Sequence, residues 1–409
     1  MSEFLLGLAL IWIAATGMGW LAVRLGQPRV VGEIIAGVLL GPSVLGIELA
    51  RAVFPQQSLF ALRVLATIGL ISFMYTVGLD FDMRVLKGSW SKVILLALAS
   101  AAIPAALAWP LASILPQAGF MQPGADPVAY RWFLAAALSV SAFPVAAVIL
   151  YELEMIDSPL GELGIGTTAV VTVLMFVLLA YAEGIATGAP LSALGAKLLG
   201  LALLLVFLFL VFQPGWDHLA RRNPDLFQRA SSVHIVFVFV LAVITAVATR
   251  LLGFTFLLGP FLLGAAVIPN PGLRRRLSDP LRWSTRWLLL PIFFVVSGLS
   301  TNLRLITPAM VFPILLVVLI GVVGKLGAII PTGRALGLPW KESFLLASLL
   351  NCRGLLVLVI ALAGQELGLI GPGLFIALVA LSLLSTIMTG PLINLATGPR
   401  TKPSLGDST

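Results

Sequence analysis

Long apolar runs recur along the whole chain and constrain its fold more than any other feature. Of the 409 residues, 60% are hydrophobic and only 10% are charged, whereas soluble domains carry about 25% charged residues. A helix needs about 20 apolar residues to cross a bilayer. The sequence therefore predicts an all-α polytopic membrane protein, a single membrane domain over 1–409. We count thirteen spans, several interrupted by Gly or Pro, with starts near Phe4, Arg29, Ser58, Val93, Tyr130, Leu160, Leu191, Val233, Gly253, Trp287, Pro308, Glu342 and Gly373.

The basic residues between these runs predict an orientation. With thirteen spans, one side of the membrane collects seventeen Lys and Arg residues, and the other collects six, namely Arg51, Arg63, Arg131, Lys197, Arg250 and Arg304. Cytoplasmic loops are enriched in Lys and Arg. We therefore expect an integral protein of the cytoplasmic (inner) membrane of a bacterium, with its N-terminus outside and its C-terminus in the cytoplasm.

Composition excludes several classes of function. One cysteine and two histidines leave too few ligands for a multi-cysteine or histidine-rich metal site, so we expect no metal and no cofactor. The net charge of +8 comes from loops between apolar runs, where topology explains it. We therefore expect the lipid bilayer, and no nucleic acid, as a partner.

An internal repeat suggests how the spans are arranged. FMYTVGLDFDMRVL (73–86) aligns with FFVVSGLSTNLRLI (293–306) at an offset of 220, and GVLLG (37–41) aligns with GPFLLG (259–264) at an offset of 222. In the predicted topology the paired segments cross the membrane in opposite senses. Inverted repeats of this kind are typical of secondary transporters.

Two basic residues lie deep in apolar sequence, Lys325 in VVLIGVVGKLGAII and Arg353 in SLLNCRGLLVLV. A charge at the bilayer centre costs at least ~2.5–3.5 kcal/mol, so a chain that keeps two has a use for them. In one interpretation they hold a substrate. In the other, each donates hydrogen bonds to main-chain carbonyls, a task for which the five donors of arginine are well suited.

Two spans are broken at corresponding places. The fifth carries Pro144 within SVSAFPVAA, and the twelfth carries Asn351 and Gly354 within LLNCRGLLV. Proline removes an intrahelical hydrogen bond, and main-chain groups freed in this way must face protein or a water-lined cavity. Paired broken helices predict a binding site at mid-membrane, although a lone proline kink also serves packing.

Several segments of the chain resemble the monovalent cation/proton antiporter superfamily, in particular its sodium/hydrogen exchanger domain. The residues that carry the resemblance are VVGEIIAGVLLGPSVLG (30–46), GLDFDMRVL (78–86), SAFPVAAVIL (141–150), GPFLLGAAVIP (259–269), FFVVSGLSTNL (293–303), GLPWKESFLLASLLNCRGLLVLV (337–359) and STIMTGPL (385–392). They span nearly the whole chain in family order.

The resemblance implies an architecture. It predicts a core domain with two crossing broken helices, made by helices of about 93–187 and 308–398. It predicts a scaffold that forms a homodimer, made by helices of about 4–80 and 233–303, with a linker helix of about 191–213.

The sequence departs from this family where the ion binds. Relatives carry an acidic pair in the sixth span, and here the aligned positions are Val171 and Thr172 within GTTAVVTVLMF. Val357 replaces a further acid of the twelfth span, while the family's basic positions remain as Lys325 and Arg353. Among the acids, only Glu33 lies clearly within a span. Exchange of a proton for a cation uses a group that titrates, so the sequence predicts a degenerate, electropositive site.

Two functions remain open. The first is monovalent cation (Na⁺ or K⁺)/H⁺ antiport, with the ion held by main-chain oxygens, Ser141, Thr168, Thr172 and Asn351, and with Lys325 or Glu33 as the catalytic, titrating group. The threonines have a second interpretation, bonding back to carbonyls one turn earlier, and Glu33 has one as a structural or gate residue.

The second function is an antiporter fold repurposed for a lipophilic anion of the natural-product type. Lys325 and Arg353 would hold its acidic head, because charge-assisted bonds to arginine are strong. Such a protein would export the compound or process it as a membrane-embedded enzyme.

Overall fold

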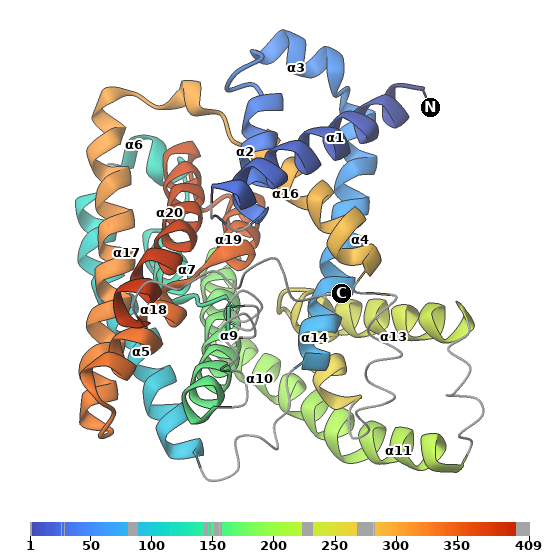
Figure 1. Ribbon diagram of the computed structural model, residues 1–409, viewed down its shortest axis with the longest axis vertical. Helices are drawn as coiled ribbons and strands as arrows, with labels where there is room; N and C mark the ends of the chain where they lie inside the picture. Colours follow the sequence, from blue (N-terminus) through green and yellow to red (C-terminus); the bar gives the residue numbers. More distant parts are fainter. Residues whose placement is uncertain are drawn as a thin grey trace, which may run out of the picture.

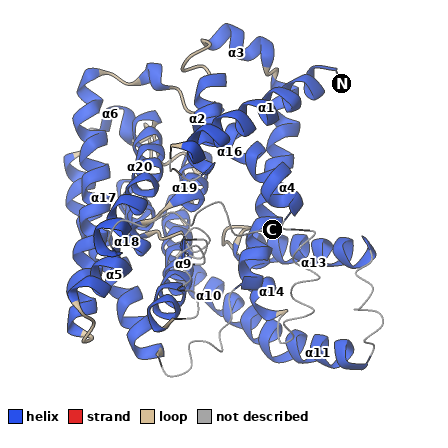
Figure 2. Cartoon of the chain, viewed as in Figure 1, coloured by secondary structure: helices blue, strands red, loops and turns tan. Residues whose placement is uncertain are grey.

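The computed structural model describes residues 2–25, 27, 29–80, 89–115, 117–142, 146, 149–150, 155, 158–222, 232–267, 281 and 283–397. Within these ranges the regular secondary structure is helical, and the only extended pairing is an isolated bridge between Met121 and Ile370 (Figure 2). An all-helical chain satisfies its main-chain hydrogen bonds internally, as a lipid environment requires. The predicted fold class is confirmed.

Eight helices of the described ranges are long and apolar enough to cross a membrane, and a ninth span is counted when two helices bent by 40° are taken together. The remaining predicted spans correspond to shorter helices, among them α2 (Arg29–Leu40) and α14 (Leu258–Ala266). The count of thirteen therefore stays a prediction.

One group of helices packs around two close crossings. Its members are α1 (Ser2–Arg24), α2, α4 (Gln56–Asp80), α13 (Ser232–Leu251), α14 and α16 (Leu290–Leu299). α2 crosses α16 where Gly37 meets Gly298, and α4 crosses α14 where Gly78 meets Gly264. A Cβ atom on Gly37 would lie 2.2 Å from the carbonyl oxygen of Val295, so only glycine permits this approach of the two backbones.

A second group forms the other side of the molecule in Figure 1. It consists of α5 (Trp90–Ile114), α7 (Pro127–Ser139), α9 (Pro159–Ala186), α17 (Pro308–Ala335), α18 (Trp340–Asn351), α19 (Gly354–Glu366) and α20 (Pro372–Thr397). α5 contacts α7, α9 and α17, while α20 contacts α17, α18 and α19. Two of these helices, α7 and α18, are short and end inside the group.

A long helical segment joins the two groups. α10 (Leu191–Val206) runs into the π-helical η2 (Phe207–Phe212) and then into α11 (Gln213–Arg222). α10 contacts α9 of the second group, and η2 contacts α14 of the first. The short elements are α3 (Ile47–Val53), α6 (Gln117–Phe120), the π-helical η3 (Thr285–Leu289) and the 3₁₀ turn η4 (Leu303–Leu305).

Candidate functional site

The two broken helices meet at their breaks. α7 ends at Ser139, and the chain continues in extended conformation. α18 ends at Asn351, and α19 begins at Gly354, whose φ of 47° lies in the left-handed region. The Ser141 hydroxyl donates to the carbonyl of Leu350 at 2.8 Å, and the amide of Ala142 donates to the carbonyl of Cys352 at 2.8 Å. The end of α7 and the break between α18 and α19 are thus tied together by hydrogen bonds. We refer to this place as the crossing.

One of the two breaks lies where the sequence predicted it, between Asn351 and Gly354. The other begins before the predicted position, because α7 stops at Ser139. Pro144, to which we attributed that break, lies outside the described residues.

Lys325 lies on α17 and is fully buried beside this crossing. Its ammonium group donates three hydrogen bonds, to the hydroxyl of Ser100 at 2.8 Å, to the carbonyl of Ser100 at 3.0 Å and to the carbonyl of Ser139. The three N–H groups of a lysine are therefore all engaged.

The carbonyl oxygens that Lys325 contacts have a reason to be free. In α5, the partner of the Ser100 carbonyl would be the amide of residue 104, but that residue is Pro104, which has no N–H. The Ser139 carbonyl is the last of α7, and the last four carbonyls of a helix have no intrahelical partner. Lys325 thus donates to two carbonyls that lack an intrahelical donor, one because of Pro104 and the other because α7 ends.

Arg353 satisfies the same helix end from the other side. It is fully buried in the break between α18 and α19. Its Nη1 donates to the carbonyls of Leu138 and, at 3.4 Å, Ala137, and its Nη2 donates to the carbonyl of Gly321 on α17. Two cations therefore gather at the C-terminal end of α7, where the helix dipole is negative. The main-chain interpretation of both charges matches these contacts.

No carboxylate pairs with either cation among the described residues. The salt bridges of this part of the chain are Arg29–Glu33 at 2.8 Å and Arg250–Glu183 at 3.3 Å. In α9, the acidic residues are Glu162 in the first turn and Glu183 near the end. Val171 and Thr172 are buried between them. The crossing is therefore electropositive.

The predicted ligands of α9 bond mainly to their own helix. The Thr172 hydroxyl donates to the carbonyl of Thr168 at 2.8 Å, and the Thr168 hydroxyl donates to the carbonyls of Gly164 and Ile165, each at 2.9 Å. Asn351 differs, since it is fully buried and neither atom of its side-chain amide has a partner. The structure thus brings Ser141, Lys325, Asn351 and Arg353 to the crossing, and leaves both threonines engaged within α9.

Glu33 belongs to a separate cluster in the first group of helices. It is 3% exposed on α2, and its carboxylate accepts a hydrogen bond from Arg29. The Arg29 guanidinium also lies 4.4 Å above the ring of Trp287. These contacts agree with a structural or gate role, and none of the hydrogen bonds of Glu33 reaches the crossing.

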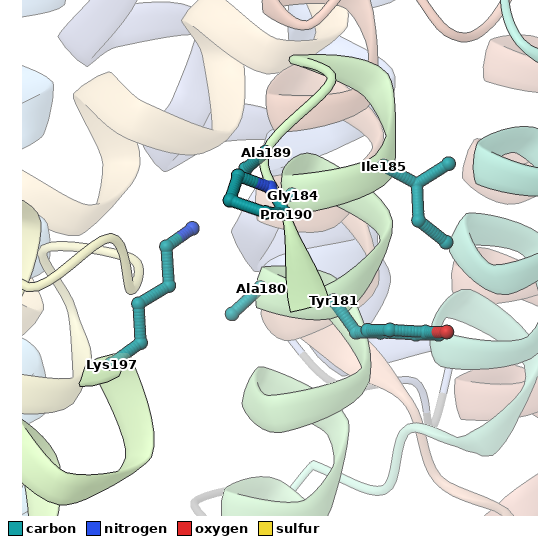
Figure 3. Close-up of a pocket in the computed structure, with 7 residues that line it drawn as sticks. All are labelled: Ala180, Tyr181, Gly184, Ile185, Ala189, Pro190 and Lys197. Atoms are coloured by element: carbon teal, nitrogen blue, oxygen red, sulfur yellow. The ribbon is translucent and has the colours of Figure 1, made fainter. Parts of the chain in front are cut away.

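Two small cavities lie away from the crossing. The first, of about 120 Å³, lies between the end of α9 and the start of α10, where Lys197 extends toward Gly184 and Pro190 (Figure 3). The second, of about 170 Å³, is lined by Tyr130 and Arg131 among others. Both are smaller than the ~300–1,000 Å³ of typical small-molecule sites, and neither includes a residue of the crossing. They offer no support for a lipophilic anion at Lys325 and Arg353.

Three residues of this site were not predicted from the sequence. Ser100 and Ser139 provide the oxygens around Lys325, and Pro104 frees one of them. The proline was the available signal, because a proline inside a span leaves the carbonyl four residues earlier without its donor.

The fold and the crossing define an integral membrane transporter in which one span is broken between α18 and α19, beside the end of α7. Residues 11–396 match the sequence profile of the transmembrane sodium/hydrogen exchanger family, so the chain belongs to this family.

The relatives agree with that assignment. The chain is 33% identical over 381 residues to the Na⁺/H⁺ antiporter NhaS4 of Synechocystis, and the match covers 92% of each chain. It is 30% identical to Cation/H⁺ antiporter 17 of Arabidopsis thaliana, covering 95% of this chain and 48% of the plant protein. It is 26% identical to K⁺/H⁺ antiporter 1 of Saccharomyces cerevisiae, covering 90% of this chain and 43% of the yeast protein. The chain thus spans about half the length of the plant and yeast relatives.

The same fold occurs in a solved structure. The sodium proton antiporter MjNhaP1 from Methanocaldococcus jannaschii matches with a TM-score of 0.65 at 16% identity, over 97% of this chain and 99% of the other. At this identity the likeness concerns the fold alone.

Proposed function

We propose that the protein exchanges a monovalent cation, Na⁺ or K⁺, for a proton, and that Lys325 carries the proton. The observation behind this proposal is the set of three oxygens around the ammonium group, the carbonyls of Ser100 and Ser139 and the hydroxyl of Ser100. Carbonyl oxygens of this kind also replace the hydration shell of an alkali cation. One oxygen site can therefore hold either the lysine proton or the cation.

Competition for these oxygens couples the two ions. A protonated Lys325 occupies the site and repels an alkali cation by its charge. When the proton leaves, the neutral amine needs fewer acceptors, and the three oxygens become available to the cation. The total charge at the crossing stays the same in both states. No carboxylate is needed for this exchange, which accounts for Val171 and Thr172 at the positions where relatives carry acids.

The proposal includes a movement of one helix group against the other. Helices of about 93–187 and 308–398 would form the mobile core, and helices of about 4–80 and 233–303 the scaffold. Lys325, Arg353 and both helix breaks belong to the proposed core. The oxygen site would therefore move together with the core as a rigid unit. The segment of about 191–213 would serve as the linker.

We also propose the inverted repeat, with α2 aligned on α14 at an offset of 227 residues in place of 222. Gly32 and Gly37 of α2 contact α1 and α16, and Gly259 and Gly264 of α14 contact α13 and α4 in the corresponding way. The glycine pairs lie 227 residues apart, as do their contact partners Met18 and Thr245. The sequence offset of 222 places Gly37 on Gly259, whose contacts differ. An offset of 227 thus relates α1 and α2 to α13 and α14. The partners of Gly37 and Gly264, which are Val295 and Tyr75, lie 220 residues apart, as in the other predicted pair of segments, and both relations support a repeat.

We further propose a homodimer in a bacterial inner membrane, with the N-terminus outside and the C-terminus in the cytoplasm. The distribution of Lys and Arg residues along the sequence supports this orientation.

Proton flux in reconstituted vesicles tests the function. A pH-sensitive dye trapped inside vesicles should report proton movement when Na⁺ or K⁺ is added to the wild-type protein. Lys325→Met keeps the apolar stem but has no proton to exchange, so its flux should fall to the level of protein-free vesicles. Lys341→Met, which removes an exposed lysine at the start of α18, is the control and should keep full flux. Absence of flux with every alkali cation, or full flux in Lys325→Met, overturns the proposal.

A further inference from the structure

The crossing carries more positive charge than its own residues neutralise. Lys325 and Arg353 are both fully buried, and both donate to carbonyls at the end of α7. Among the described residues, Glu33 is the one buried acidic side chain, and it pairs with Arg29. Arginine stays charged in proteins, and a buried charge without a counter-charge is strongly unfavourable. Carbonyl dipoles satisfy hydrogen bonds, but they supply no net negative charge.

Two fully buried residues at the break between α18 and α19 have side-chain polar atoms without a hydrogen-bond partner. The Nε of Arg353 has no partner, nor has either side-chain amide atom of Asn351, and both residues are fully buried. Buried polar atoms without a partner are rare in proteins and point to an unseen ligand or water. These atoms belong to residues two apart in the chain, at the break between α18 and α19.

The start of α19 adds a third feature to the same region. This helix of 13 residues begins at Gly354, and no side chain caps its N-terminus. The first amides of a helix point outward and carry the positive end of its dipole, which makes a ready site for an anion. Arg353 and Asn351 immediately precede this terminus. The start of α19 thus follows two donors that have no partner, the Nε–H of Arg353 and the side-chain NH₂ of Asn351.

We propose that a monovalent inorganic anion, represented by chloride, binds at the start of α19. The Nε–H of Arg353, the side-chain NH₂ of Asn351 and the first amides of α19 would donate to it. A cation does not fit at this point, because the Nε–H of Arg353, the side-chain NH₂ of Asn351 and the helix amides are all donors. A small anion is favoured, because the surrounding residues Asn351, Cys352 and Arg353 are all fully buried. The anion supplies negative charge beside the buried side chains of Lys325 and Arg353.

Binding can be measured on the purified protein without any ion gradient, so it is independent of the proposed exchange. The melting temperature is recorded in detergent as potassium chloride replaces potassium gluconate at constant ionic strength. We expect a saturable rise with chloride, and with bromide as a substitute. In crystals grown with bromide, an anomalous peak should lie next to Asn351 and Arg353. A melting temperature that is the same in chloride and gluconate, or a bromide site elsewhere only, overturns the proposal.

Two substitutions of Asn351 separate an anion site from a general structural role. Asn351→Leu removes the amide donors and should raise the apparent dissociation constant for chloride at least tenfold. Asn351→Asp places a carboxylate at the anion position, so this variant should be as stable in gluconate as the wild type is in chloride. Gln365→Leu, at the exposed far end of α19, is the control and should keep the wild-type chloride dependence. Unchanged chloride dependence in Asn351→Asp contradicts the assignment, even if Asn351→Leu fails to fold.

Discussion

The pairing of Lys325 with a carbonyl freed by Pro104 makes a prediction about two residues on different helices. In Lys325→Met, the carbonyls of Ser100 and Ser139 lose their donor. Each unsatisfied buried carbonyl costs about 1–3 kcal/mol, so the variant should lose roughly 2–6 kcal/mol before relief of the lysine's own desolvation. In Pro104→Ala, the new amide of residue 104 can donate to the Ser100 carbonyl. The second substitution should therefore repair part of the first.

The size of this repair is given by a double-mutant cycle. Alanine is favoured over proline in a helix interior by about 3 kcal/mol, but that gain occurs in both backgrounds and cancels in the cycle. What remains is the satisfaction of one carbonyl, so the coupling free energy should be about 1–3 kcal/mol. Equilibrium unfolding of the four proteins in mixed detergent micelles measures it.

A second cycle serves as the control. Pro110 also lies inside α5, but the carbonyl that it frees belongs to Ala106 and has no bond to Lys325. Lys325→Met and Pro110→Ala should therefore be additive within about 0.5 kcal/mol. Equal coupling in the two cycles, or additivity in the first, refutes the assignment of Lys325 to the carbonyl freed by Pro104.

Three further predictions follow from other contacts. Gly264→Ala would place a Cβ 2.2 Å from the carbonyl of Tyr75, while Gly17 has nothing within 4 Å; only the first substitution should lower the melting temperature, by an amount equivalent to at least ~1–3 kcal/mol. Glu33→Gln breaks the pair with Arg29 and should destabilise the protein by about 1–3 kcal/mol, yet cation-dependent proton flux should persist. Thr172→Val should keep both stability and flux, because the hydroxyl bonds its own helix; loss of flux would make Thr172 an ion ligand.

Much of the fold could be predicted because lipid permits few backbone structures. The apolar runs predicted helices, and Asn351 and Gly354 predicted the break of the twelfth span, which separates α18 from α19. Lys325 and Arg353 were also identified from sequence, since charges are costly in such runs.

The contacts of the site could not be predicted to the same extent. The packing of α5, α7 and α17 decides which carbonyls Lys325 and Arg353 contact. The hydropathy of the sequence carries no information on that packing. Ser100 and Ser139 are ordinary residues of apolar helices until α17 places Lys325 beside them. A threonine hydroxyl in a membrane helix can bind an ion or donate to a carbonyl one turn earlier. Only the geometry showed that Thr168 and Thr172 donate within α9.

Proton release on cation binding tests the central claim most directly. The purified protein in weakly buffered detergent solution is titrated with Na⁺ or K⁺, and a pH indicator reports the protons released. If Lys325 gives up its proton to the cation that takes its oxygens, the wild type should release about one proton for each cation bound, by linkage. Lys325→Met should release none. Cation binding without proton release in the wild type, or equal release from Lys325→Met, would contradict the account.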